Sequence, residues 1–293
     1  MRSKNTKSMI SQAQFEEEIE LIIQNALRED VGDGDHSSLA CIPKDAKGKA
    51  KLLVKENCVI AGLDFAKQVF KLLDPKSEID FKAKDGDPVK VGDVVFTIES
   101  TSQSILKGER LVLNAMQRMS AIATKTSQFT EVLKGTKTRI LDTRKTTPGF
   151  RALEKWAVKI GGGVNHRFAL YDMIMLKDNH IDFAGGIHQA IEKTQAYLKQ
   201  NNLDLKIIVE ARDLNEIQQI IQHQGIHRIL IDNFSYEDTR KAVDLIGDFC
   251  QTESSGGITL STAREYANCG VDFISSGALT HSVYNVDLSL KAI

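Results

Sequence analysis

The stretch KIIVEARDLNEIQQIIQHQGIHRILIDN (residues 206–233) carries the pattern that decides the fold. It contains two short apolar runs, Lys206–Val209 and Arg228–Ile231, and each run is followed by a polar cluster. Between them, Asp213 and Glu216 have the spacing of a helix capping box. A strand, a helix and a second strand in this order predict two parallel strands joined by a right-handed crossover.

The same alternation extends over the second half of the chain. Four further apolar runs precede polar clusters, at residues 139–142, 173–176, 249–252 and 271–274. Ser235 can cap the segment through Ile246. Thr262 has capping-box spacing to Glu265. An open doubly wound sheet and an α/β barrel both fit this alternation. Nearly every run ends in charged or small polar residues, which favours an incomplete parallel α/β barrel of six or seven strands.

The preceding part of the chain predicts a mixed α/β lobe of sandwich-like form. The expected elements are a helix from about residue 15 that ends near residue 30, a strand over 49–55, a helix over 63–73, and strands joined by turns over 79–99. An apolar stripe without proline predicts a long helix over 104–134 that bridges the two lobes. We therefore expect the lobe to span residues 1–122 and the catalytic barrel residues 123–281, with the tail 282–293 packing back on the lobe.

The composition excludes several classes of partner. The 293 residues are 42% hydrophobic and 26% charged, and the net charge is −1, so no global field attracts nucleic acid or an anionic membrane. The four cysteines form no CxxC pair, which argues against a disulfide framework or a zinc site. The basic start, Met1–Lys7, is followed by acidic residues without an apolar signal core. No stretch approaches the roughly 20 apolar residues of a membrane span. These features predict a cytoplasmic enzyme.

A local excess of positive charge marks the candidate active site. From Arg139 through His180 there are eight Lys or Arg and two His, against four acidic residues, and this excess predicts an anionic ligand. Arginine forks match the geometry of carboxylates, so Arg144 and Arg167 are candidates for gripping them, while Lys145 and Lys177 supply point charge. For the two lysines of a predicted helix, Lys155 and Lys159, we expect only ion pairing or coverage of the surface.

Glycine- and serine-rich loops supply the other candidate binding elements. Gly161–Gly163 precedes His166 and Arg167, which favours a close approach of the backbone to a ligand. Taken singly, His166 and His180 are more typical of hydrogen-bonded structural histidines. Two further loops each precede an expected helix start, where exposed N–H groups suit a phosphate. These loops are Ser255-Gly256-Gly257 and Ser275-Ser276-Gly277.

Two carboxylates follow adjacent middle strands of the predicted barrel, Glu210 and Asp232. They could accept ribose hydroxyls, stabilise a cationic sugar transition state or hold a hard cation such as Mg²⁺. Ion pairing with Arg212 or Arg228 is an equally open alternative.

Several motifs resemble those of the quinolinate phosphoribosyltransferase family, the decarboxylating nicotinate-nucleotide pyrophosphorylases. They occur in the family's order and spacing over nearly the whole chain: Asp30–Asp35, Arg110–Asn114, Gln117–Arg118, Leu141–Gly149, Leu153–Lys155, Gly161–Arg167, Lys177–His180, Asp232–Phe234, Ser255–Ile258 and Gly277–His281. Two departures are small, since Ala121 stands where the family usually has Gly, and Ser254 where Ala is common. Neither changes a charged group, so both bear on local packing only.

The resemblance implies that the chain converts quinolinate and phosphoribosyl pyrophosphate, with Mg²⁺, to nicotinate mononucleotide, pyrophosphate and carbon dioxide in NAD biosynthesis. Catalytic roles are implied for Lys145, Lys177, Glu210 and Asp232. Quinolinate would be held by Arg144, His166, Arg167 and Lys177, with Thr143 and Lys145 beside them. Glu210 and Asp232 would meet the ribose and the metal, which is bound mainly through the substrate pyrophosphate. The 5′-phosphate would lie on the loops at Ser255, Gly256 and Gly257 and at Ser275, Ser276 and Gly277.

The resemblance also implies a homodimer, or a higher assembly of dimers, in which Arg110 enters the site of the partner. Two other interpretations remain open at this stage. Residues 85–93 resemble the turns of lipoyl-type binding modules, although no lysine sits at a hairpin tip as in those modules, so we expect structural turns. A relative that uses nicotinate without decarboxylation is the nearer alternative.

Overall fold

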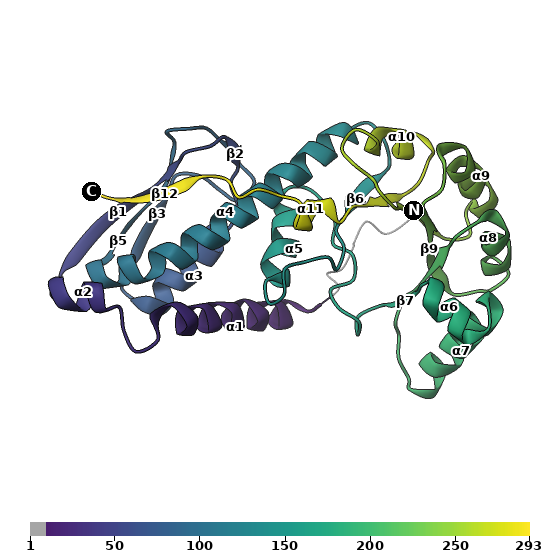
Figure 1. The fold of residues 1–293 in the computed structure, drawn as a ribbon, viewed down its shortest axis with the longest axis horizontal. Coiled ribbons are helices and arrows are strands. Elements are labelled where there is room, and N and C mark those ends of the chain that lie inside the picture. Colours follow the sequence, from purple (N-terminus) through teal and green to yellow (C-terminus); the bar gives the residue numbers. More distant parts are fainter. Residues whose placement is uncertain (1–9) are drawn as a thin grey trace. The chain divides into compact units, whose positions relative to one another are not determined.

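The computed structural model describes residues 10–293, so the predicted basic start of the chain, residues 1–7, lies outside the described residues. The described residues form two compact units. The antiparallel unit comprises residues 11–127, 145–162 and 279–293 (Figure 1). The parallel unit comprises residue 10, residues 128–144 and residues 163–278. The expected boundary between residues 122 and 123 stays a prediction.

The antiparallel unit is built on a four-stranded sheet with the order β12-β1-β5-β3 (Figure 1). Its strands are β1 (Lys47–Val54), β3 (Glu78–Phe81), β5 (Val94–Thr101) and β12 (Leu288–Ala292), and a second small sheet pairs β2 (Cys58–Val59) with β4 (Pro88–Val89). Ala50 of β1 pairs with Ala292 of β12, so the tail of the chain completes the sheet. Residues 85–93 form tight turns, in which Asp87 N–H donates to Lys84 O and Asp93 N–H donates to Lys90 O, as expected for structural turns.

Helices bury their apolar stripes against this sheet and against one another. They are α1 (Gln12–Val31), α2 (His36–Cys41), α3 (Leu63–Leu73), most of α4 (Ser102–Val132), α5 (Arg151–Ile160) and the end of α11 (Ala278–His281). Phe70 of α3 and Phe96 of β5 are fully buried and make an edge-to-face contact with ring centroids 6.4 Å apart. Gly108 lets α4 approach α3, because an added Cβ would lie 2.7 Å from the Phe70 ring. The unit is therefore a sheet with a helical layer, the mixed lobe that the sequence predicts.

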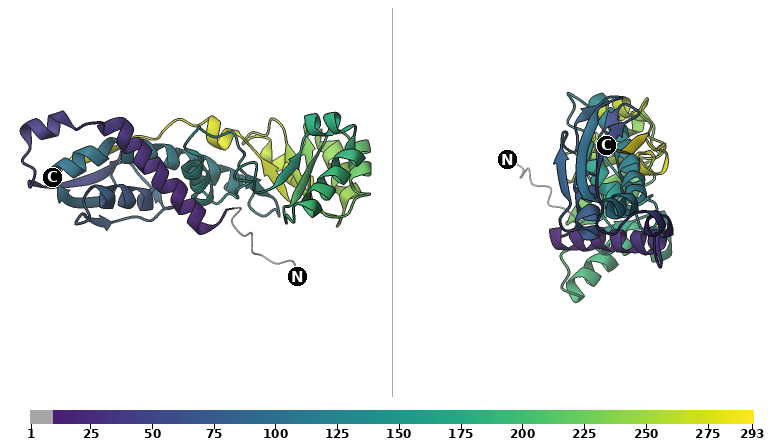
Figure 2. Two further views of the ribbon diagram at one scale, coloured as in Figure 1. Left: turned by 90° about the horizontal axis from the view of Figure 1, so that it is seen from below. Right: turned by 90° about the vertical axis from the view of Figure 1, so that its left-hand side faces the viewer.

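The parallel unit contains a six-stranded sheet with the order β6-β11-β10-β9-β8-β7, in which every neighbouring pair is parallel. Its strands are β6 (Arg139–Leu141), β7 (Ile174–Leu176), β8 (Ile207–Ala211), β9 (Ile226–Asp232), β10 (Gln251–Ser255) and β11 (Phe273–Ser275). Its helices are α6 (Asp178–Ala184), α7 (Ile187–Gln200), α8 (Leu214–Ile220), α9 (Tyr236–Ile246) and α10 (Ala263–Asn268). These helices cover one face of the parallel sheet, as Figure 1 and Figure 2 show. The predicted fold class is confirmed.

The sheet is open between β6 and β7, which are its two edges among the described strands. Val164 forms an isolated parallel bridge with Leu141 on the free side of β6. This bridge is held by the Val164 N–H, which donates to Ile140 O over 2.9 Å, and by the Asp142 N–H, which donates to Val164 O over 3.2 Å. A short seventh segment thus extends the six strands.

Two of the three predicted helix caps form. The side chain of Asp213 accepts a hydrogen bond from the Glu216 N–H at the start of α8, and Ser235 accepts from the Asp238 N–H at the start of α9. The predicted helix start at Thr262 is confirmed, since Thr262 is the N-cap residue of α10, but its hydroxyl accepts from the N–H of Thr259 and does not cap the helix. None of the helices within residues 10–293 is long and apolar enough to cross a membrane.

Candidate functional site

The strand register brings the predicted polar residues to one face of the parallel sheet. Glu210 of β8 aligns with Leu230 of β9, and Leu230 aligns with Glu253 of β10. Because side chains alternate along a strand, these residues share a face. Asp232 and Ser255, two residues further along their strands, are also aligned with each other on this face. An apolar cluster of Met173, Met175, Ile208 and Leu230 lies among the same strands. Apolar and polar side chains therefore occur together on this part of the sheet.

A buried charged cluster lies on the same face, centred on Glu253. Its Oε2 lies 2.7 Å from Nη1 of Arg228 and 3.3 Å from Nε2 of His166. The Arg228 guanidinium also stacks 4.1 Å from the centroid of the Phe273 ring. Burial acts to raise the pKa of the Glu253 carboxyl, but His166 and Arg228 outweigh it and lower that pKa to about 2. Glu253 is therefore ionised, and its carboxylate holds the side chains of Arg228 and His166 in place.

The segment that carries His166 and Arg167 is held at the end of β6 by Asp142, whose side chain is fully buried. Its carboxylate accepts from Asn165 Nδ2 over 2.6 Å and from the His166 N–H over 2.7 Å. The Arg167 N–H donates to His166 Nδ1 over 2.7 Å, so the ring proton of His166 is at Nε2, facing Glu253. The backbone and ring of His166 are thus fixed from three sides.

Two predicted anion-binding arginines, Arg144 and Arg167, influence each other electrostatically. Arg167 is buried, and its Nη1 donates to Met173 O over 3.2 Å. Burial lowers the pKa of the Arg167 guanidinium, and the positive charge of Arg144 lowers it further. The negative charge of Asp172 acts in the opposite direction on this pKa.

Lys177 and Glu210 form an ion pair, with Lys177 Nζ 3.1 Å from Glu210 Oε2. The lysine side chain is about half exposed, while that of Glu210 is 8% exposed. His180 contributes as a helix cap, because its Nδ1 accepts from the Lys177 N–H over 3.1 Å. The expected structural role of this histidine is confirmed.

The ion pairs offered as alternatives for the two carboxylates do not form. Arg212 instead pairs with Glu216, at 2.6 Å, and with Asp182, at 3.1 Å. Arg228 pairs with Glu253. Glu210 and Asp232 are therefore not counter-ions of the arginines that the sequence suggested.

The loop after β10 approaches the end of β9 closely. Gly256 has φ +99°, and an added Cβ would lie 2.1 Å from Asn233 Oδ1. The Asn233 N–H donates to Ser255 O over 2.9 Å, which ties the two strand ends together. The loop precedes α10, which begins at Ala263, next to the predicted helix start at Thr262. The predicted strand over 249–252 is displaced, since β10 spans Gln251–Ser255.

The loop after β11 leads directly into α11, as predicted. The hydroxyl of Ser276 donates to Ile258 O over 2.8 Å, and its N–H donates to Leu141 O over 3.2 Å. Ser275 is the last residue of β11 and is 7% exposed. Thr143, Arg144 and Gly277 also belong to the parallel unit.

The antiparallel unit holds the remaining predicted residues. Arg110 lies on α4 and is exposed, and Lys145 follows Arg144 and is exposed. Lys159 is exposed on α5 as expected. Lys155 is only 2% exposed, so the expectation that this lysine covers the surface is wrong. Gly161 packs closely against helix α4, because an added Cβ would lie 2.4 Å from Ala123 O, and the approach of the triple glycine to a ligand stays a prediction.

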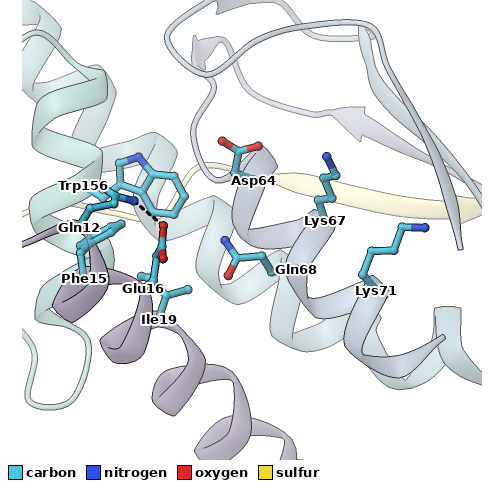
Figure 3. A pocket seen from close by; sticks show the side chains of 9 residues that line it. All are labelled: Gln12, Phe15, Glu16, Ile19, Asp64, Lys67, Gln68, Lys71 and Trp156. Atoms are coloured by element: carbon cyan, nitrogen blue, oxygen red, sulfur yellow. Dashed lines mark hydrogen bonds between the residues drawn. The ribbon is translucent and has the colours of Figure 1, made fainter. Parts of the chain in front are cut away.

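A cavity of about 400 Å³ lies elsewhere in the antiparallel unit (Figure 3). Its lining comes from α1, α3 and α5: Gln12, Phe15, Glu16, Ile19, Asp64, Lys67, Gln68, Lys71 and Trp156. In Figure 3, Phe15 and Trp156 lie together at one end, and the two lysines extend from α3 at the other. None of the predicted site residues lines it, so it is distinct from the candidate site.

Sequence reasoning assigned no role to two acidic residues that organise the structure, Glu253 and Glu154. Both are completely buried. One available signal was the alternation within β10, which puts Glu253 on the same face as Ser255. The other was the position of Glu154 on the apolar side of an amphipathic helix, between buried Leu153 and Ala157.

Comparison with known proteins identifies close similarity over the whole fold. Residues 35–120 match the quinolinate phosphoribosyl transferase N-terminal domain, and residues 122–291 match the quinolinate phosphoribosyl transferase C-terminal domain. The chain is 42% identical over 285 residues to quinolinate phosphoribosyltransferase (decarboxylating) 1b from Nicotiana tabacum, covering 92% of this chain and 81% of the relative.

The chain is also 41% identical over 289 residues to the chloroplastic nicotinate-nucleotide pyrophosphorylase (carboxylating) from Arabidopsis thaliana, covering 94% of this chain and 82% of that protein. The nicotinate-nucleotide pyrophosphorylase structure from Francisella tularensis superposes with a TM-score of 0.88 at 34% identity, covering 99% of this chain and 100% of that one. With both domains matched in order and the same fold throughout, the chain belongs to the quinolinate phosphoribosyltransferase family.

Proposed function

We propose that this chain transfers the phosphoribosyl group of phosphoribosyl pyrophosphate to quinolinate. The products are nicotinate mononucleotide, pyrophosphate and carbon dioxide, so the chain is a decarboxylating pentosyltransferase of NAD biosynthesis. Membership of the family over both domains carries this conclusion. The excess of positive charge between Arg139 and His180, which includes Arg144 and Arg167, supports it, because guanidinium groups match the geometry of carboxylates.

Quinolinate is held, in this proposal, by Arg144, His166, Arg167 and Lys177, with Thr143 and Lys145 beside them. The contacts of His166 support its place in this set. Its Nδ1 accepts from the Arg167 N–H, so it fixes the backbone of the arginine that grips a carboxylate. Lys145 and Arg110 belong to the antiparallel unit, and their roles are assigned by family resemblance alone.

Glu210 and Asp232 are assigned to the ribose and to Mg²⁺. Both carboxylates lie on one face of adjacent strands, and hard oxygen donors suit this cation. Within residues 10–293, however, no group of three or more His, Cys, Asp or Glu is arranged to hold a metal. This donor set fits a Mg²⁺ ion bound mainly through the substrate pyrophosphate. When bound there, the ion would neutralise charge on the departing pyrophosphate.

The residues of the chain act mainly by position and charge. The arginines and Lys177 orient the quinolinate nitrogen toward the anomeric carbon of the ribose. Glu210 and Asp232 place negative charge where the sugar develops positive charge as its bond to pyrophosphate breaks. Once the ring nitrogen is quaternised, it stabilises the carbanion left when the adjacent carboxylate departs as carbon dioxide, and a proton from solvent then forms the new ring C–H bond. No covalent enzyme intermediate is required.

The 5′-phosphate of the sugar is assigned to the loops Ser255–Gly257 and Ser275–Gly277. The close packing of Gly256 against Asn233 supports this assignment, since two residues without side chains, Gly256 and Gly257, follow the end of β10. Both loops follow strands at the carboxyl edge of the parallel sheet, where barrel enzymes commonly bind phosphate.

The assembly belongs to the same proposal: a homodimer, or an assembly of dimers, in which Arg110 serves the partner's site. Location in the cytoplasm is likewise proposed. Mixing Arg110→Ala protein with Arg167→Ala protein tests the assembly, because exchange of subunits creates one intact site per mixed dimer. Activity should reappear on mixing. Without recovery, despite exchange shown with two differently tagged chains, Arg110 would act within its own chain.

An assay with defined substrate pairs tests the reaction. Purified protein should release carbon dioxide only when quinolinate, phosphoribosyl pyrophosphate and Mg²⁺ are all present, and nicotinate mononucleotide should form in equal amount. Efficient turnover of nicotinate in place of quinolinate would contradict the proposal and favour the non-decarboxylating alternative.

A further inference from the structure

A closed ring of hydrogen bonds surrounds the backbone of Lys145 in the antiparallel unit. Its centre is the carboxylate of Glu154, on α5, which is completely buried. Glu154 accepts from Arg118 of α4 through Nε, over 3.1 Å, and through Nη2, over 2.9 Å. It also accepts from Thr147, from the N–H over 3.1 Å and from the hydroxyl over 2.9 Å. Four donors therefore converge on one carboxylate.

The ring continues through Thr280 and returns to Lys145. Arg118 Nη2 donates a second hydrogen bond, to the carbonyl of Thr280. The Thr280 hydroxyl, which is fully buried, donates to the carbonyl of Lys145 over 2.7 Å. Arg151 Nε donates to the hydroxyl of Thr146 over 2.9 Å, between the two fixed points. Each residue from 145 to 147 is thus held by a separate contact.

This arrangement is more than a buried ion pair that stabilises a fold. An isolated pair of Arg118 and Glu154 would need no contact with an exposed loop. Here both members also bind the loop or the residue that holds it: Glu154 binds Thr147, and Arg118 binds Thr280. Charge-assisted hydrogen bonds in a buried setting are strong and directional. They fix the direction in which the exposed Lys145 side chain leaves the backbone.

We propose that Glu154, Arg118 and Thr280 are positioning residues for Lys145. The inference rests on the proposed function, in which Lys145 supplies positive charge to the bound dicarboxylate. Displacing a catalytic group by about 1 Å can reduce the rate by roughly 10²-fold. Loosening the ring should therefore lower turnover while leaving the antiparallel unit folded.

The sharpest variant is Thr280→Val, which removes the hydroxyl that donates to Lys145 O and changes the side-chain volume little. We expect kcat/KM for quinolinate to fall about 10- to 100-fold. Thr126→Val is the matched control. Thr126 is also fully buried in this unit, and its hydroxyl donates to the Ile122 carbonyl over 2.8 Å, away from the loop. The control should retain near-normal kcat/KM at a similar melting temperature.

A double-mutant cycle with Lys145→Ala separates positioning from general damage. If Thr280 acts through Lys145, Thr280→Val should cost activity in the wild-type chain and almost none in the Lys145→Ala chain. An equal fold-loss in both backgrounds would overturn the inference. If Lys145→Ala alone has no effect, the proposed role of Lys145 fails instead, so the two failures are distinguishable.

Glu154→Gln gives a second measurement that does not depend on Thr280. The amide oxygen can still accept from Thr147, but the charge that draws Arg118 is lost. We expect a partial loss of kcat/KM that again vanishes in the Lys145→Ala background. Glu154→Gln with unchanged kcat/KM and a reduced melting temperature would show that the carboxylate serves stability alone.

Discussion

Nη1 of Arg228 lies 2.7 Å from Oε2 of Glu253, and both side chains are buried on the polar face of the parallel sheet. Each member of this pair depends on the other, because a buried charge without a counter-charge strongly destabilises the folded state. Glu253→Gln should lower the free energy of unfolding by about 3–5 kcal/mol, since the Arg228 guanidinium would lose its counter-charge. Urea denaturation measures the change.

The control is an exposed pair, Glu237 and Lys241, which are 2.7 Å apart on α9. Glu237→Gln should change stability far less, since exposed ion pairs are screened by solvent. Adding Arg228→Met to Glu253→Gln should recover part of the loss. Equal effects of the buried and exposed substitutions would show that burial of the pair has no energetic consequence.

Acid should destabilise the protein through His227. Burial, together with the charges of Lys206, Arg228 and His166, lowers the pKa of His227 from 6.5 to about 4. Between these values the unfolded chain binds a proton that the folded chain does not. The free energy of unfolding should therefore fall as the pH decreases from 6.5 to 4, and this contribution should level off below pH 4.

His227→Gln should flatten that part of the stability curve, measured by urea denaturation at several pH values. His36→Gln serves as the control, because the His36 side chain is 76% exposed. If the wild-type and His227→Gln curves have the same slope between pH 6.5 and 4, another group is responsible.

Ser254 carries a buried hydroxyl whose oxygen has no hydrogen-bond partner within residues 10–293. Its side chain is 1% exposed, and it aligns with Ile231 and Ile274 on the face opposite Glu253. Burial of an unbonded hydroxyl is unfavourable. Ser254→Ala should therefore raise stability by about 1 kcal/mol, seen as a higher melting temperature, without changing kcat/KM. A loss of stability would reveal a partner for this hydroxyl.

The two arginines of the proposed carboxylate grip should act on one substrate. Arg144→Ala and Arg167→Ala should each raise the KM for quinolinate far more than that for phosphoribosyl pyrophosphate, as when a buried charge contact worth about 2–5 kcal/mol is lost. Arg139→Ala is a suitable control, since Arg139 is exposed at the opposite end of β6 from Arg144. Comparable changes in both KM values would mean that the cluster is not divided between the substrates in this way.

Local signals predicted many elements of the fold. Helix α3 spans residues 63–73 as expected, because its apolar residues recur with helical spacing and bury one face. The sequence pattern placed the strand at residues 249–252, whereas β10 spans Gln251–Ser255. The reason is that three consecutive polar residues, Glu253, Ser254 and Ser255, are typical of a loop. Glu253 is tolerated inside a buried strand only through Arg228 and His166, which come from distant parts of the sequence. The order of residue types along the sequence does not reveal which distant residues form these pairs.

The candidate site shows the same division between local and tertiary information. Arg144, Arg167 and Lys177 stood out as an excess of local charge. Burial of Lys155 and the packing of Gly161 against α4 depend instead on which helix lies beside them. The central position of Glu154 likewise depends on Arg118, which is 36 residues away in sequence. Such roles follow from tertiary contacts that the sequence pattern does not specify.

The pairing of Ala50 with Ala292 has a consequence for the order in which the protein is made. Strand β1 emerges from the ribosome early, but β12 can join it only after the six parallel strands have been synthesised. At about 5–20 residues per second, that interval is roughly 10–50 s. Throughout it, one edge of β1 has unpaired backbone groups that a chaperone or a second nascent chain can bind. The parallel sheet can therefore form completely before the antiparallel sheet does, although the first strand of the antiparallel sheet is synthesised earlier.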